Sequence, residues 1–302
     1  MRMIFADIET FFSKEYSLRH LTVPEYVLDP RFELICVSAQ VDDGPIQFID
    51  GPDFATWLKQ FDPADTIMVC YNSLFDSCAI AWRYHFVPAR LIDVLGMARC
   101  LLGHKLRRLS LDAVSKHLNA GEKGDAVHTV VGMNRQNIIN AGLWPAYAEY
   151  NRQDVRILKA IFNKLAPTFP KAEYRLMDLV LRCAVQPQFV ADLPRLEAHL
   201  KKVRADKEQL LASANVEKAQ LMSAAAFVAL LEAEGVEVET KISGTGNEIP
   251  AVAKTDRFMT DLAEHENPRV QALAAARLGH KSTIDETRTE RLIAIARLPW
   301  SA

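Results

Sequence analysis

The first 168 residues alternate between short apolar runs and longer amphipathic segments. Runs rich in β-branched and aromatic residues predict strands, and apolar residues that recur every three or four positions predict helices. The predicted strands are residues 2–8, 32–39, 45–49, 66–71 and 91–93. The predicted helices are residues 53–61, 74–86, 94–102, 109–118 and 142–165, and residues 121–125 are typical of a loop. This order predicts an antiparallel meander followed by βα alternation, which is an α/β domain with a mixed sheet flanked by helices.

The pattern changes after the long helix. Pro167 and Pro170 end that helix, because proline cannot continue it, and they predict a domain boundary that separates residues 1–168 from residues 169–302. Beyond it, residues 172–234 and 255–297 are helical in pattern and are separated by a flexible loop at residues 243–247. The second region is therefore predicted to be mostly helical.

Composition narrows the class of protein. The chain has 302 residues, enough for two domains, and its 49% hydrophobic and 25% charged content is that of a globular protein. We find no apolar run that could cross a membrane, no signal-peptide pattern and no C-x-x-C pair among the five cysteines. We therefore expect no membrane partner and a cytoplasmic location, in a bacterium or a phage-infected host. A net charge of −2 neither indicates nor excludes nucleic acid, since a carboxylate site reverses its local charge when it binds cations.

Two acids lie close together in the first predicted strand. Asp7 and Glu9 are separated by one residue, so a strand points both side chains to the same face. Two adjacent carboxylates repel each other unless water or a positive charge lies between them. The pair is therefore either part of a solvated surface or half of a cation site.

A third acid follows the apolar strand at residues 66–71. Asn72 at the end of this strand is typical of a residue that caps the following helix, and Asp76 lies about one turn further on. The ends of sheet strands are where α/β folds present their ligand sites. Asp76 is thus either an ordinary residue of the first helical turn or a member of the same site.

A fourth acid lies within the helix at residues 142–165. Tyr150 and Asp154 are four residues apart and share one face, which continues as a core-facing stripe of Ile157, Leu158 and Ile161. An acid on such a stripe costs free energy unless it is paired or bound to a metal. The alternative is a hydrogen bond between Tyr150 and Asp154 that anchors the helix.

Together the acids predict a metal site at one edge of the sheet. The four candidate ligands are Asp7, Glu9, Asp76 and Asp154. Four converging carboxylates would need two divalent cations, and a pair of cations about 3.5–4 Å apart is the arrangement that cleaves phosphodiesters. Ligation by oxygen alone favours Mg²⁺ or Mn²⁺ over zinc.

Three motifs in this order resemble those of the DEDD exonuclease superfamily. They are Asp7-x-Glu9, Asn72-x-x-Phe75-Asp76 and Tyr150-x-x-x-Asp154. The set is similar to the tyrosine subclass found in the proofreading domains of A-family DNA polymerases. The histidine subclass would need a histidine where this chain has Glu149.

The resemblance implies an RNase H-like fold and removal of nucleotides from 3′ ends as 5′ monophosphates. It implies that Asp7 bridges two cations and that Glu9 and Asp154 hold the one associated with the attacking water. Asp76 would act at or near the other cation. Tyr150 would orient the water together with Glu9.

Further stretches resemble a phage-type branch of the A-family polymerases. They are Glu15–Leu18, Pro24–Tyr26, Asp29–Glu33 and Leu109–Val114. In the second region, residues 250–256 and 281–291 resemble the thumb of the same polymerases. The palm, with its catalytic aspartates, is not represented, so we expect no polymerase activity from this chain.

Aromatic and basic residues are candidates for nucleic-acid contact. Phe11, Phe12 and Phe75 flank the acidic motifs and could stack on bases, and Asn72 belongs to the second motif. In the second region, a basic stripe on one predicted helix would suit phosphate contacts; it consists of Arg277, Lys281, Arg288 and Arg291. The alternative is a solvated face neutralised by Asp285, Glu286 and Glu290.

The leading hypothesis is a metal-dependent 3′→5′ exonuclease that acts on DNA 3′ ends, either single-stranded or frayed, and that carries a thumb-like helical region. One alternative keeps the chemistry and changes the substrate to RNA. Another is a module of a split or truncated polymerase that joins a separately encoded palm polypeptide. We expect the intact acids and Tyr150 to be active, because an idle site has no physical reason to keep buried carboxylates.

Overall fold

The computed structural model describes residues 1–122, 129–187 and 189–300, and it divides into two compact units. The first unit runs from Met1 to Phe189 and includes the described residues from Leu298 to Trp300, and the second unit is Val190–Arg297. Of the predicted loop at residues 121–125, residues 123–125 lie outside the described part of the chain. Within that part, no helix has the length and apolar character needed to cross a membrane.

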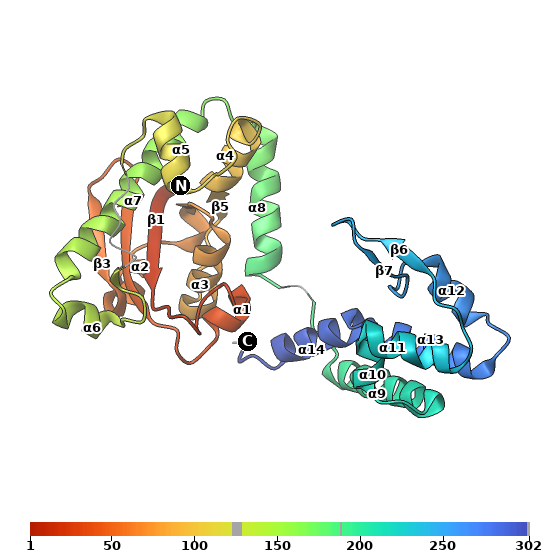
Figure 1. Ribbon diagram of the computed structural model, residues 1–302. Coiled ribbons are helices and arrows are strands. Elements are labelled where there is room, and N and C mark those ends of the chain that lie inside the picture. The colour runs from red at the N-terminus through yellow and green to blue at the C-terminus, as the bar shows by residue number, and fades with distance from the viewer. Residues whose placement is uncertain (123–128, 188, 301–302) are drawn as a thin grey trace. The chain divides into compact units, whose positions relative to one another are not determined.

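The first unit contains a five-stranded sheet in the order β3-β2-β1-β4-β5 (Figure 1). The strands are β1 (Arg2–Thr10), β2 (Leu34–Val41), β3 (Ile46–Asp50), β4 (Thr66–Cys70) and β5 (Arg90–Asp93). Strands β1, β2 and β3 form an antiparallel meander, and β4 and β5 run parallel to β1. This confirms the predicted mixed sheet, and its strand order is that of the RNase H-like fold.

Helices cover both faces of this sheet. The helices of the first unit are α1 (Val23–Val27), α2 (Phe54–Leu58), α3 (Leu74–Tyr84), α4 (Val94–Leu102), α5 (Leu111–Leu118), α6 (Arg135–Asn140), α7 (Trp144–Leu165) and α8 (Lys171–Val185), with short 3₁₀ turns at Gly51–Asp53 and Pro63–Asp65. Helices α1 and α6 were not predicted. Each is only one or two turns long, and local caps define it: Glu25 accepts from the Thr22 N–H in α1, and Asn134 accepts from the Asn137 N–H at the start of α6.

Strand β1 divides the core of the first unit into two layers. Ile4, Ala6 and Ile8 pack with buried residues of α1, α2, α3 and α8. Phe5, on the opposite face, packs with buried residues of α4, α5 and α7. Because side chains alternate along a strand, Asp7 and Glu9 share the α7 face with Phe5. The acids therefore lie where the apolar layer beneath α7 ends.

The domain boundary lies later than predicted. Helix α8 belongs to the first unit, where Leu181 and Val185 are buried and the Asp178 carboxylate accepts a 2.9 Å hydrogen bond from the Leu91 N–H. The Trp82 indole also donates to the Val185 carbonyl, at 2.9 Å. The prolines at 167 and 170 end α7, but they lie in a short turn and not in a domain linker, because α8 follows directly and packs in the first unit. The boundary at residue 168 is thus corrected to the segment after Phe189.

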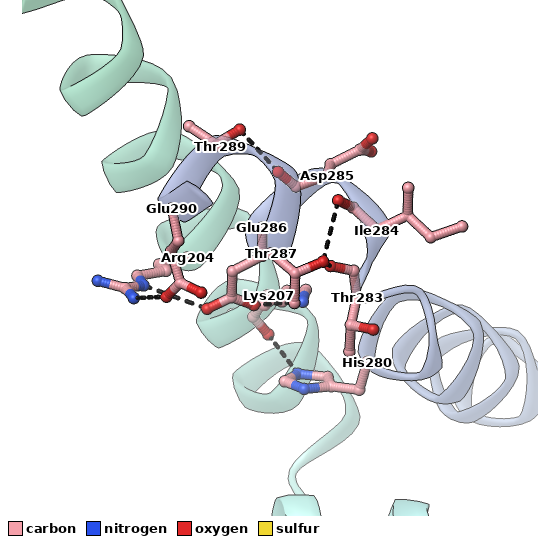
Figure 2. Close-up of polar contacts among 10 residues, drawn as sticks. All are labelled: Arg204, Lys207, His280, Thr283, Ile284, Asp285, Glu286, Thr287, Thr289 and Glu290. Carbon is pink, nitrogen blue, oxygen red and sulfur yellow. Dashed lines mark hydrogen bonds and ion pairs between the residues drawn. The ribbon is translucent and has the colours of Figure 1, made fainter. Parts of the chain in front are cut away.

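The second unit is mostly helical, as predicted. Its elements are α9 (Leu193–Ala214), α10 (Lys218–Met222), α11 (Ala224–Ala233), α12 (Arg257–Ala263), α13 (Pro268–Lys281) and α14 (Ile284–Ala296), with a hairpin of β6 (Thr240–Ile242) and β7 (Glu248–Pro250). This hairpin flanks the predicted loop and was missed, since two three-residue strands carry little pattern. Figure 2 shows the ion pairs that join α9 to α14, in which Arg204 and Lys207 both contact Glu286.

We expect the Asp178→Ala variant to be destabilised by about 2 kcal/mol, because it leaves the buried Leu91 N–H without its acceptor and removes the carboxylate that Arg90 and Arg182 contact. Urea unfolding followed by circular dichroism measures this change. Asp43→Ala is the matched control: it also removes an aspartate from an ion pair, with Lys159, but Asp43 is fully exposed, so its loss should cost far less stability. Equal losses in the two variants would contradict the role given to Asp178.

Candidate metal centre

Strand β1 and helix α7 bring three of the predicted ligands together. One carboxylate oxygen from each of Asp7, Glu9 and Asp154 lies within 4.8 Å of the others. Asp154 is buried with 3% of its surface exposed, and the two β1 acids are half-buried. Three carboxylates this close repel one another strongly in a partly desolvated site. The arrangement therefore suits a positive charge at its centre.

Asp76 lies beside this cluster, on the first turn of α3. Its side chain is buried and accepts a 3.3 Å hydrogen bond from the Ile8 N–H, between the two acids of β1. Burial raises the pKa of Asp76 well above its usual range, and the charge of Asp7 raises it further. The structure thus brings the fourth predicted acid to β1, between the two acids of that strand, and couples it electrostatically to Asp7.

Two residues of the site were not predicted from the sequence. The Tyr147 hydroxyl donates to Glu9 Oε2 at 3.1 Å, and the Asn151 side-chain amide donates to Asp7 Oδ2 at 2.7 Å. Together with Tyr150 and Asp154 they occupy positions i, i+3, i+4 and i+7 of α7, which is one helical face. Extending the predicted Tyr150–Asp154 face by one turn would have found Tyr147.

Tyr150 is buried on the same face as Asp154. Burial is the main cause that raises the pKa of its hydroxyl, and the charges of Asp154, Glu9 and Asp7 add to it. A side-chain hydrogen bond with Asp154 also raises this pKa, so the alternative contact considered for the pair is present alongside the acidic cluster. Tyr150 is therefore a protonated phenol that faces carboxylates.

The turn between β4 and α3 is held by Asp93. One of its oxygens accepts hydrogen bonds from the N–H groups of Asn72 at 2.8 Å, Ser73 at 3.2 Å and Leu95 at 3.0 Å. The last of these hydrogen bonds caps the N-terminus of α4. Asn72 is exposed with a φ of +60°, a conformation that asparagine tolerates, and Ser73 takes the N-cap position of α3 in its place. This turn sets where α3 begins and hence where Asp76 lies.

A pocket of about 290 Å³ adjoins Glu9. It is lined by Ile8, Glu9, Thr10, Phe12, Ser17, Leu18, Tyr26 and Phe75. Two predicted base-stacking residues, Phe12 and Phe75, thus line the pocket. The third, Phe11, is not among the lining residues; its ring stacks on Tyr16 at 5.9 Å.

The predicted basic stripe of the second unit does not lie on a single helix. Helix α13 ends at Lys281 and α14 begins at Ile284, so the spacing of four, seven and three residues crosses a helix break. Arg277 is 1% exposed and donates to the carbonyls of Leu221 and Val252, which makes it a core residue. Lys281 and Arg288 are exposed and stay candidates for phosphate contact.

The donor set of the site fits the predicted cations. All three clustered ligand atoms are carboxylate oxygens, which are the ligands preferred by Mg²⁺ and Mn²⁺. The half-buried positions of Asp7 and Glu9 leave that side of the cluster open to solvent. Residues Asp7, Glu9 and Asp154 could therefore hold a divalent cation, with Asp76 adjacent.

Comparison with known proteins gives only distant likenesses. No family model matches the chain, and no curated protein matches it in sequence. Among solved structures, RNase D of Trypanosoma brucei in complex with RNA has 19% identity and a TM-score of 0.46, over 63% of this chain and 65% of that one.

Two further structures are similar at the same level. NrnC of Brucella melitensis with bound Mg²⁺ has 16% identity and a TM-score of 0.41, over 61% of this chain and 81% of that one. The POL domain of Pol1 from M. smegmatis, in complex with DNA primer-template and dNTP, has 17% identity and a TM-score of 0.48, over 97% of this chain and 46% of that one. Likenesses of this size assign neither a family nor an activity to the chain.

We expect Asp154→Asn to stabilise the protein in the presence of a chelator, because the amide removes one of three mutually repelling charges. A gain of about 1 kcal/mol would raise the melting temperature by roughly 2–4 °C for a unit of this size. The same variant should lose the further rise that Mn²⁺ gives the wild type. Differential scanning calorimetry with and without Mn²⁺ measures both effects.

The control for this experiment is Glu149→Gln, which makes the same chemical change on an exposed position of α7. It should gain no stability in chelator, since it breaks ion pairs with Arg152 and Arg156, and it should keep the response to Mn²⁺. A variant Asp154→Asn that is less stable than the wild type in chelator, yet still stabilised by Mn²⁺, would contradict the metal centre.

Proposed function

We propose that this protein is a metal-dependent 3′→5′ exonuclease of the DEDD type with a tyrosine in its third motif, and that it hydrolyses DNA from 3′ ends to 5′ mononucleotides. The observation that carries the proposal is the convergence of Asp7, Glu9 and Asp154 within 4.8 Å, with Asp76 adjacent, beside an aromatic-lined pocket. Acids that can hold divalent cations, next to a pocket that can take the terminal nucleobase, suit phosphodiester hydrolysis at a chain end.

The residues of the metal centre have different proposed roles. When bound, two divalent cations supply an activated water and stabilise the leaving 3′ oxygen. Asp7, Glu9, Asp76 and Asp154 are the residues that would hold them. Tyr150 would orient the water together with Glu9. Because its pKa is raised, Tyr150 stays protonated at neutral pH and acts as a hydrogen-bond donor, not as a base.

The pocket next to Glu9 is the proposed site for the terminal nucleotide. Phe12 and Phe75 offer aromatic surface on which a base could stack, and base stacking of this kind tolerates any sequence. Only an unpaired base can enter such a pocket, which supports a single-stranded or frayed 3′ end as substrate. Asn72 is exposed on the turn before α3, where it could contact the same strand.

The choice of DNA over RNA rests on the second unit, whose residues 250–256 and 281–291 resemble a polymerase thumb. Lys281 and Arg288 are exposed there and are the proposed phosphate contacts.

A separate palm polypeptide is the partner that the resemblance to a polymerase thumb suggests. Co-elution of the chain with such a polypeptide on a sizing column is the test for that partner.

A 5′-labelled single-stranded DNA oligonucleotide tests the activity itself. With Mg²⁺ or Mn²⁺ we expect a ladder of labelled products, because removal of nucleotides from the 3′ end leaves the 5′ label on each shortened strand. The ladder should disappear with a chelator and in Asp7→Ala, which removes the acid coupled to every other member of the centre. A parallel RNA oligonucleotide distinguishes the two substrates, and faster cleavage of RNA would overturn the choice of DNA.

The pocket variant Phe12→Ala should raise the KM for the oligonucleotide by about tenfold while kcat changes less, since loss of one stacking contact costs roughly 1–3 kcal/mol. Steady-state kinetics on the same substrate measures this. Phe189→Ala is the control, because Phe189 is almost fully exposed and does not line the pocket. If Phe12→Ala and Phe189→Ala behave alike, the pocket does not bind the terminal base.

A further inference from the structure

Two hydrogen-bond donors of α7 reach the acids of β1, one for each acid. Tyr147 is 1% exposed and donates to one oxygen of Glu9, while Asn151 is fully buried and donates to one oxygen of Asp7. The two donors are one helical turn apart, and the two acceptors are two residues apart on the strand. This spacing matches one turn of a helix to one repeat of a strand.

Each donor contacts one specific oxygen of its carboxylate. A carboxylate has two oxygens and about four lone pairs, so one hydrogen bond does not exhaust it. Hydrogen bonds to an ionised carboxylate are about twice as strong as neutral ones. The donors therefore offset part of the repulsion between Asp7 and Glu9 and restrict how each carboxylate can turn.

The Asn151 side chain is itself oriented by the sheet. Its amide nitrogen also approaches the Asp7 carbonyl, at 3.2 Å, and its amide oxygen accepts from the Cys36 thiol of β2, at 3.9 Å. Reversing the amide would set its oxygen against two oxygens of Asp7, so the donor must face the acid. Cys36 pairs directly with Glu9 across the sheet, which connects the supports of the two acids.

We propose that Tyr147 and Asn151 are positioning residues, which hold Glu9 and Asp7 in the orientation that binds the divalent cations before any cation arrives. This inference rests on the proposed metal-dependent function and names the residues that prepare its site. Partners that orient metal-binding groups commonly contribute 10–100-fold to metal affinity. A purely structural role, by contrast, would tie α7 to the sheet and leave the affinity for cations unchanged.

The test is a Mn²⁺ titration of the wild type and of Tyr147→Phe, Asn151→Leu and Ser38→Ala, by calorimetry or by the electron paramagnetic resonance of free Mn²⁺. Both donor variants should bind Mn²⁺ roughly 10–100-fold more weakly. Ser38→Ala is the matched control: Ser38 is the buried cross-strand neighbour of Asp7, and its hydroxyl has no hydrogen-bond partner among the described residues. It should bind Mn²⁺ as the wild type does.

Activity gives a second readout. On the labelled oligonucleotide, the donor variants should need correspondingly more Mn²⁺ for half-maximal rate, with an unchanged KM for the oligonucleotide, and should recover at high Mn²⁺. Asp7→Ala, which lacks a ligand, should not recover. Urea unfolding establishes that each variant is folded, and Tyr147→Phe removes a single oxygen, so it keeps the test decisive if Asn151→Leu does not fold.

The outcomes separate this inference from the function on which it rests. If the wild type binds no Mn²⁺ and cleaves nothing, the proposed function fails. If the wild type binds Mn²⁺ and both donor variants bind it equally well, or more tightly because the hydrogen bonds compete with the cation, the positioning role is wrong while the metal centre stands.

Discussion

The packing of α7 against β1 is the contact on which the rest of the first unit depends. Along the shared face the strand begins apolar, with Phe5 against Phe162 at a ring distance of 5.3 Å, and ends acidic, with Asp7 and Glu9. Helix α7 runs the other way: its N-terminal part, which includes Tyr147, faces the acids, and its C-terminal part is apolar. The apolar half supplies burial that offsets the cost of holding charges in the other half.

That cost explains why so many polar contacts surround the acids. Asp76 is buried against the Ile8 N–H, Asp93 gathers three N–H groups at the turn that leads to it, and α7 donates to both acids of β1. Each contact compensates a carboxylate that would otherwise be unsatisfied in a partly dry site. Holding several carboxylates together in this way lowers the stability of the fold, and proteins commonly tolerate such a loss where function requires it.

The connection between β1 and β2 gives the site its pocket wall. Tyr26 donates from its hydroxyl to the Phe11 carbonyl at 2.5 Å, Tyr16 donates to the Tyr26 carbonyl at 2.6 Å, and the rings of the two tyrosines stack at 4.3 Å. These contacts fix a connection of more than twenty residues that contains only one short helix, α1. The pocket beside Glu9 can therefore keep its shape without a longer element to support it.

The strands of the first unit, most of the helices and the four acids can be predicted from the sequence alone, because the two-residue period of strands and the 3.6-residue period of helices are local properties. Tertiary structure decided what depends on distant contacts. Tyr147 and Asn151 are site residues because they donate hydrogen bonds to Glu9 and Asp7. These acceptors lie 138 and 144 positions away along the chain. Arg277 reads as an exposed cation in the sequence, yet it is buried because carbonyls from two other segments accept its hydrogen bonds. No local period records which distant group a side chain will meet.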